Sequence, residues 1–199
     1  MSKSIIIAVV VIGIIVVAIG LSLLMRRRRT ERLHSVFGPE YDRAARTAGD
    51  KAKAEAELEE REKRVEKLDI RPLDASSRDR FASRWMQIQS DFVDDPRRAI
   101  GDADRLIGEV MSKRGYPVEN FNQVAADISV DHPSVVQRYR TGHDIVVRHA
   151  EGDGDTEDLR AAMINYRPLF DELVSTGGDD NDDLHKWSKK DDRRTRARV

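Results

Sequence analysis

The side chains best suited to acid–base or metal chemistry in this chain are its five histidines, because imidazole titrates near neutral pH and is the commonest metal ligand. They are His34, His132, His143, His149 and His185. No two of them form an H-E-x-x-H pair, which would place two imidazoles and a general base on one helix face. His143 shares an apolar helical stripe with Tyr139, where a hydrogen-bonded core histidine is the usual arrangement. We therefore predict no metal site and no cofactor.

Two acidic stretches have part of the spacing of a calcium-binding loop, at residues 153–157 and at residues 179–183. In the first stretch, the sixth loop position is Asp158 where the loop needs Gly, and the twelfth is Ile164 where it needs Glu. The second stretch lacks both residues as well. The sequence therefore predicts a solvated loop and an acidic tail.

Motifs for enzymatic catalysis are missing from the sequence. It has no P-loop, no dinucleotide fingerprint and no G-x-S-x-G elbow, and without cysteine it has no thiol nucleophile. Because a catalytic set is defined by geometry, an enzyme of unrecognised type with a pocket among helices stays an alternative. Four side chains stand out as core or partner-surface candidates: Trp85, Tyr139, His143 and Tyr166.

The strongest pattern is an apolar run next to a basic cluster. Residues 5–25 are 21 consecutive residues without a charge, and Arg26, Arg27, Arg28 and Arg29 follow at once. As a helix this run would be about 31 Å long, close to the thickness of a hydrocarbon core, and a helix satisfies its own backbone in lipid. The run therefore predicts one transmembrane helix.

The flanking charges predict how this helix is oriented. Residues 26–32 hold five Arg and one Glu, a net charge of +4, whereas only Lys3 and the α-amino group precede the run. Positive flanks stay on the cytoplasmic side, so we expect residues 1–4 outside and residues 26–199 in the cytosol. The alternative, a cleaved signal peptide, would have a shorter apolar core and a small-residue cleavage site.

The lipid bilayer is thus the first expected partner. The four arginines at residues 26–29 could also hold anionic headgroups, although their role as an orientation signal is sufficient. Gly13 and Gly20 share one face, and Ala18 with Ser22 forms a small-xxx-small pair, so a weak homodimer through the span is possible.

Residues 26–37 are expected to continue helically as a basic juxtamembrane segment up to Gly38-Pro39. Residues 38–69 are rich in Ala, Glu, Lys and Arg and predict one long, charged, solvated spacer helix of roughly 45 Å. Its thin alanine stripe gives only a weak coiled-coil pattern.

Residues 70–175 predict a compact domain of five helices with apolar faces at spacings of three and four. Ser76 with Asp79, Asp95-Pro96 and Asp131-His132-Pro133 are expected helix starts, Thr156 is expected to cap the last helix, and Gly115 is an expected helix end. Pro168 should kink or shorten the last helix. No stretch alternates with period two, so the fold class is all-α, with a bundle-like or orthogonal array.

The charge is unevenly distributed between the segments. Residues 70–175 carry 14 basic and 19 acidic groups, net −5, and residues 176–199 carry 7 and 6, net +1. An acidic domain makes nucleic acid an unlikely main ligand. The polar tail at residues 176–199 is expected to be disordered.

Several strings resemble a family of uncharacterised bacterial proteins, described as hypothetical membrane or secreted proteins with a helical domain. They are residues 35–42 (SVFGPEYD), 65–73 (VEKLDIRPL), 130–133 (VDHP) and 138–140 (RYR), and the resemblance extends over residues 30–175. It implies a membrane-anchored helical protein and carries over no activity or site residue.

The sequence thus favours a non-enzymatic interaction or scaffold protein at the cytoplasmic membrane face, with an unknown protein partner. The two alternatives are the enzyme of unrecognised type and a tether for nucleic acid that uses the Arg-rich ends of the cytosolic chain.

Overall fold

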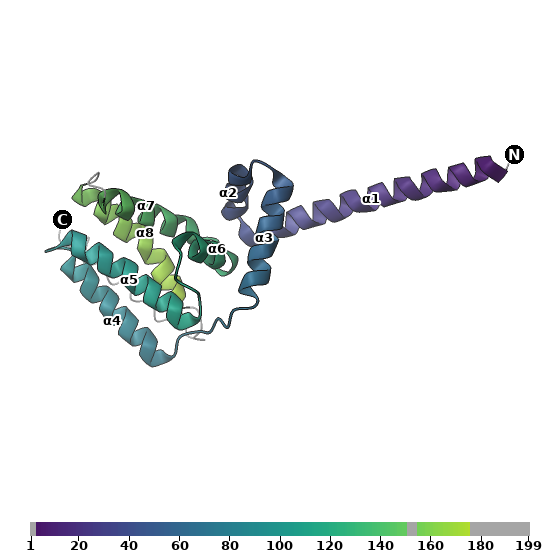
Figure 1. The fold of residues 1–199 in the computed structure, drawn as a ribbon. Coiled ribbons are helices and arrows are strands. Elements are labelled where there is room, and N and C mark those ends of the chain that lie inside the picture. Colours follow the sequence, from purple (N-terminus) through teal and green to yellow (C-terminus); the bar gives the residue numbers. More distant parts are fainter. Residues whose placement is uncertain (1–2, 151–154, 176–199) are drawn as a thin grey trace, which may run out of the picture. The chain divides into compact units, whose positions relative to one another are not determined.

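The structure, a computed structural model, describes residues 3–150 and 155–175, with side chains from residue 11 onwards. Within these ranges all regular elements are α-helices, which confirms the all-α class (Figure 1). The helices are α1 (Lys3–Phe37), α2 (Pro39–Ala48), α3 (Lys51–Val65), α4 (Ala75–Asp91), α5 (Pro96–Arg114), α6 (Phe121–Asp131), α7 (Val136–Ala150) and α8 (Thr156–Ser175). The chain divides into an N-terminal unit, residues 1–60, and a helical domain that begins at Arg61.

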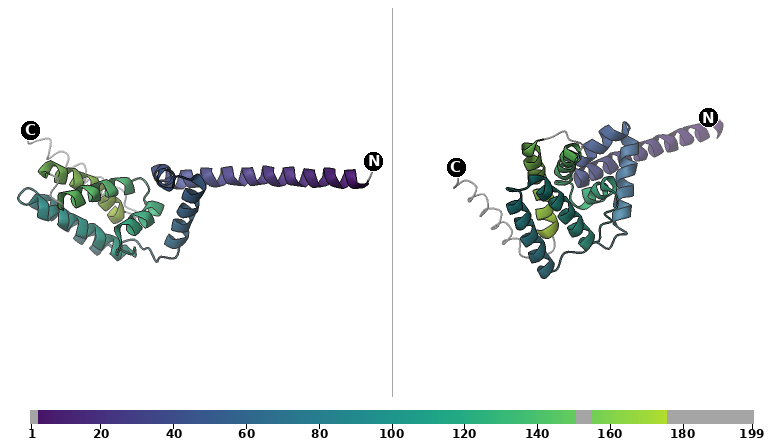
Figure 2. Two further views of the ribbon diagram at one scale, coloured as in Figure 1. Left: turned by 45° about the horizontal axis from the view of Figure 1, so that its top comes forward. Right: turned by 60° about the vertical axis from the view of Figure 1, so that its left-hand side comes forward.

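Helix α1 is continuous from the apolar run through the arginines to Phe37, as expected for residues 26–37 (Figure 1, Figure 2). Gly38, with φ +49°, separates it from α2. In the part of the chain that the structure describes, none of the helices has both the length and the apolar character to cross a membrane.

The prediction of one spacer helix over residues 38–69 is wrong, because the chain turns at Gly49 and Asp50. Gly49 takes the left-handed conformation, φ +63°, and the Asp50 carboxylate accepts a hydrogen bond from the Lys53 amide at 2.9 Å. The turn at these two residues divides the predicted spacer into α2 and α3. Of the predicted stripe Tyr41, Ala45, Ala48 and Ala52, only Tyr41 is buried, and Ala52 is exposed. The other buried apolar residues that the structure describes in the N-terminal unit are Leu33, Phe37, Ala44, Ala54 and Leu58.

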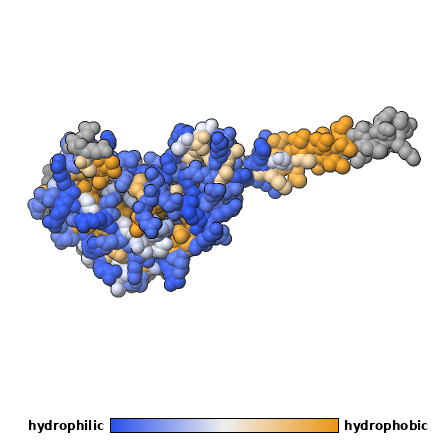
Figure 3. Space-filling view, in the orientation of Figure 1, coloured by the Kyte–Doolittle hydropathy of each residue, from blue (hydrophilic) through white to orange (hydrophobic). Residues whose placement is uncertain are grey.

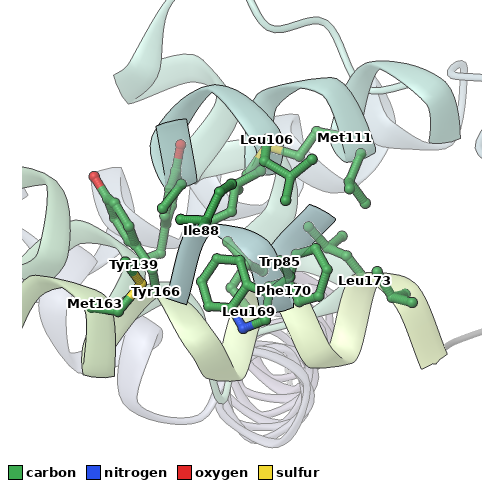
Figure 4. Close-up of a cluster of buried hydrophobic side chains, with 14 of the residues drawn as sticks. Trp85, Ile88, Leu106, Met111, Tyr139, Met163, Tyr166, Leu169, Phe170 and Leu173 are labelled. Atoms are coloured by element: carbon green, nitrogen blue, oxygen red, sulfur yellow. The ribbon is translucent and has the colours of Figure 1, made fainter. Parts of the chain in front are cut away.

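Helices α4 to α8 form the predicted five-helix domain. Helix α8 packs against α7, α5 and α4, and α4 also packs against α5. The predicted inward residues of α8 are all buried: Leu159, Met163, Tyr166, Phe170 and Leu173. Figure 4 shows the centre of this core, where Trp85 stacks on Phe170 with ring centroids 4.4 Å apart.

The helix starts show where local sequence reasoning was right and where it was wrong. Asp95 caps α5 as predicted, accepting from the Arg98 amide. Asp74, not Ser76, caps α4, and its carboxylate accepts from both the amide and the hydroxyl of Ser77. At the last helix, Asp155 accepts from the amide of Asp158, so the cap lies one residue before Thr156.

Two prolines were expected to affect helix boundaries, and the expected start at Asp131-His132-Pro133 is wrong. Asp131 ends α6 and starts no helix, because His132 precedes Pro133 and adopts φ −130° and ψ 53°, outside the helical region. Helix α8 continues past Pro168 to Ser175, since packing against its neighbours outweighs the lost amide donor. The predicted tail, residues 176–199, and most of the predicted loop at residues 152–155 lie outside the described residues.

Gly115 ends α5 as predicted, and its replacement by Ala tests this turn. Its φ is +103°, and an added Cβ would lie 2.4 Å from the carbonyl oxygen of Asp69. We expect Gly115→Ala to lower the free energy of unfolding by about 2 kcal/mol or more. The matched control is Gly108→Ala inside α5, where a Cβ meets no atom within 4 Å and helix propensity should add up to about 1 kcal/mol. Urea unfolding followed by circular dichroism measures both, and equal stabilities would contradict the account.

Candidate functional site

The described part of the apolar run exposes its large side chains on every face of α1. Eleven Val, Ile, Leu and Met residues between Val11 and Met25 are exposed, from 47% at Val11 to 69% at Val17 (Figure 3). A helix that is apolar all round is normally buried in a protein core or in lipid. No described residue of the N-terminal unit covers this surface.

The arginine cluster, residues 26–29, divides into an exposed and a paired part. Arg26, Arg27 and Arg28 are exposed. Arg29 Nε lies 2.8 Å from Glu59 Oε1 and 3.7 Å from Glu55 Oε2, both on α3. Three cations therefore stay available to an anionic surface, while the fourth is neutralised within the unit.

Glu55 connects the three helices of the N-terminal unit. This residue is 7% exposed, and its Oε1 accepts hydrogen bonds from the hydroxyls of Thr30 at 2.6 Å and Tyr41 at 2.9 Å. Burial, with the Glu55 hydrogen bond and charge adding to it, raises the pKa of Tyr41 to about 12. Together with the Arg29 pair, these contacts hold α3 and α2 against the end of α1 that follows the arginine cluster.

In the helical domain, three of the four singled-out residues gather near Asp104 of α5. The Tyr166 hydroxyl donates to Asp104 Oδ1 at 2.8 Å, and His143 Nδ1 lies 3.9 Å from the same oxygen. Burial alone would raise the pKa of Asp104, but the Tyr166 and His143 interactions outweigh it, so that pKa lies below its usual range. The 3.9 Å between His143 Nδ1 and Asp104 Oδ1 is longer than a hydrogen bond.

Aromatic rings complete this Asp104 cluster. Phe121 stacks on His143, with ring centroids 3.5 Å apart, and the rings of Tyr139 and Tyr166 lie 5.8 Å apart. Burial and the nearby Asp104 charge raise the pKa values of both tyrosines. The phenols therefore keep their protons at neutral pH, and the cluster combines two buried tyrosines with the partly exposed side chains of Asp104, Phe121 and His143.

A second polar group lies beside a hollow of about 540 Å³. His132 Nδ1 lies 2.7 Å from Glu172 Oε1, and Arg114 Nη1 donates to the Leu173 carbonyl at 3.0 Å. Both basic side chains line the hollow, together with Val65, Leu68, Ile70, Val130, Glu62, Glu66 and Asp131. The last turn of α3 reaches this region because Arg64 Nε binds Asp127 Oδ1 at 2.8 Å.

Most of the four residues singled out in the sequence belong to the hydrophobic core. Trp85, Tyr139 and Tyr166 are buried, and His143 is partly exposed. Among the described residues no three His, Cys, Asp or Glu side chains could hold a metal ion together. Of the predicted acidic loop, Asp155 serves as the cap of α8, while Asp153 lies outside the described residues.

Sequence reasoning missed Asp104, Arg114 and Glu55 as organising residues. A signal was present for the first two, because Asp104 and Arg114 continue the i, i+3, i+4 apolar stripe of α5, where a charged residue is unexpected. The role of Glu55 depends on the turn at Gly49, which was not predicted.

Comparisons with known proteins found no match for this chain among protein-family models, curated protein sequences or solved structures.

The Asp104 cluster can be tested with two neighbouring tyrosines. Tyr166→Phe removes the hydroxyl that donates to Asp104, and we expect a loss of about 1 kcal/mol in unfolding free energy. Tyr139→Phe is the matched control, because it removes a hydroxyl from the adjoining ring that makes no hydrogen bond within the described residues. Urea unfolding at pH 7 measures both variants, and a larger loss for Tyr139→Phe would contradict this assignment.

Proposed function

We propose that this protein is anchored in the cell membrane by one helix over residues 5–25 and presents its remaining chain to the cytoplasm as a non-enzymatic interaction or scaffold module. The observation that carries this proposal is the uncharged run of 21 residues directly before Arg26 to Arg29. The exposed apolar side chains of α1 support it, since lipid would cover the surface that the described residues of the unit leave open.

Only part of the apolar run has described side chains. Six of its residues, Ile5 to Val10, have side chains outside the described part, so the described run holds 15 residues. A span needs about 20 apolar residues. The described part therefore contains no span by itself, and the proposal rests on the full run in the sequence.

The orientation follows from the charge on the two flanks. Arg26, Arg27 and Arg28 are exposed, and each basic side chain near an anionic leaflet contributes about 1 kcal/mol. Arg29 and Arg32 both lie near Glu59, at 2.8 Å and 3.9 Å, so they contribute less to the surface. In this proposal α2 and the start of α3 lie next to the cytoplasmic headgroups and do not form a long spacer.

The helical domain supports an interaction role better than nucleic-acid binding. Residues 70–175 carry a net charge of −5, which repels a phosphate backbone. Five large apolar side chains stay exposed on the described domain: Met86, Val93, Val118, Val147 and Ile164. They are candidate contacts for a protein partner, whose identity would be established by crosslinking the full-length protein in cells.

The enzyme alternative has one observation in its favour, the Asp104 cluster with its partly exposed imidazole. Its Tyr166 hydroxyl is bonded to Asp104, and the raised pKa of Tyr166 makes this phenol a poor source or acceptor of protons. We therefore assign the cluster to stability.

The proposed topology predicts the behaviour of a reporter fused after Val199. We expect activity from a reporter that works only in the cytoplasm, and none from one that works only outside. Replacing Arg26, Arg27, Arg28 and Arg29 by Glu should reduce the fraction of molecules with the C-terminus in the cytoplasm, because it removes the positive charge that keeps this flank on the cytoplasmic side. The matched control replaces four tail arginines, Arg193, Arg194, Arg196 and Arg198, by Glu and should leave the topology unchanged. Activity outside the cytoplasm for the unmodified chain would overturn the proposal.

A further inference from the structure

We propose that the hollow between the end of α3, the end of α5 and the α6–α7 junction binds an amphipathic anion: a carboxylate or phosphate-ester headgroup on a short alkyl chain. Arg114 and His132 would hold the headgroup, and the apolar wall would hold the chain. This site goes beyond the membrane-anchoring proposal and does not depend on it.

Arg114 is a buried guanidinium without a carboxylate partner among the described residues. The residue is 5% exposed, and its only hydrogen bond within the described chain goes from Nη1 to the Leu173 carbonyl at 3.0 Å. Its Nε is buried without a partner, and none of the described carboxylates forms an ion pair with it. A buried guanidinium is costly unless an anion compensates its charge. The hollow that Arg114 lines is the place from which such an anion could approach.

His132 lines the same hollow as Arg114, and one of its ring nitrogens has no hydrogen-bond partner among the described residues. His132 is 3% exposed, and its Nδ1 lies 2.7 Å from Glu172 Oε1. Glu172 directly precedes Leu173, so both basic side chains are fixed on consecutive residues of α8. The Nε2 atom is buried without a partner in the described chain. In the imidazolium form, with Nδ1–H donating to Glu172, Nε2–H is a second donor for the same headgroup.

The remaining walls define the rest of the ligand. Val65, Leu68, Ile70 and Val130 provide an apolar side, and the volume of about 540 Å³ lies in the range of small-molecule sites. Asp131 accepts the Tyr116 hydroxyl at 2.6 Å and is therefore engaged. Glu62, Glu66 and Asp131 line the hollow as well, so an anion fits only where its headgroup lies against Arg114 and the rest of the ligand lies on the apolar side. These features fit an anionic headgroup with an alkyl chain better than a bare inorganic anion.

The test measures binding to the full-length protein in zwitterionic nanodiscs, with four probes: octanoate, octyl phosphate, octanol and inorganic phosphate. The probes also partition into lipid, but this contribution is the same for wild type and variants in the same nanodiscs and is removed by comparing them. We expect saturable binding of octanoate or octyl phosphate, with the tighter one identifying the headgroup, and weaker binding of octanol and inorganic phosphate. Arg114→Met should weaken the anionic amphiphiles tenfold or more. Arg71→Gln, at an exposed arginine in the connection between α3 and α4, is the matched control and should bind as wild type.

A second variant keeps the test decisive if Arg114→Met does not fold. Glu66→Lys changes an exposed residue at the hollow and should strengthen octanoate binding several-fold while leaving octanol unchanged. Equal binding of octanol and octanoate would overturn the anionic part of the proposal. Binding of inorganic phosphate as tight as octyl phosphate would overturn the apolar part. Absence of saturable binding in all four arms would mean that water satisfies Arg114 and His132, and the site would be rejected.

Discussion

An α-helix with large apolar side chains on every face cannot be covered by one neighbouring element. Helix α1 is such a helix over Val11 to Met25, where burial of each exposed large side chain would contribute about 1.5–3 kcal/mol of favourable free energy. With eleven such residues described, the total of roughly 15 kcal/mol or more exceeds the stability of most domains. Under the proposed topology, lipid would cover this surface up to the arginines at its end.

The polar groups of the molecule differ in how completely they are paired. Glu55 is engaged by Thr30, Tyr41 and Arg29, so the N-terminal unit is fixed where it leaves the proposed bilayer. In the Asp104 cluster the Tyr166 hydroxyl is bonded to Asp104, whereas His143 Nδ1 has no hydrogen-bond partner among the described residues. Arg114 and His132 each use one nitrogen on α8 and leave another unsatisfied beside a hollow. Incomplete pairing of this kind marks a place for a ligand better than a charged residue alone does.

Much of the fold was predictable, because it follows from the spacing of apolar residues along each helix. The faces of α4, α5 and α8, the cap at Asp95 and the end at Gly115 all follow from spacing and turn chemistry. The split of the spacer was not predicted, because Ala, Glu and Lys favour one helix and only Gly49 signals the turn. The hollow could not be predicted, since Leu68, Arg114 and His132 meet only in three dimensions. The expected helix start at Asp131 was wrong, because His132 precedes Pro133 and lies outside the helical region.

The chain has no cysteine, so single cysteines can report the environment of each position without background. The most direct test labels Val17→Cys and Arg46→Cys in intact cells and in permeabilised cells with a membrane-impermeant maleimide. The account predicts that Val17→Cys, in the middle of the apolar run, stays unlabelled in both, and that Arg46→Cys, exposed on α2, is labelled only after permeabilisation. Labelling of Val17→Cys as fast as Arg46→Cys in permeabilised cells would contradict the membrane span.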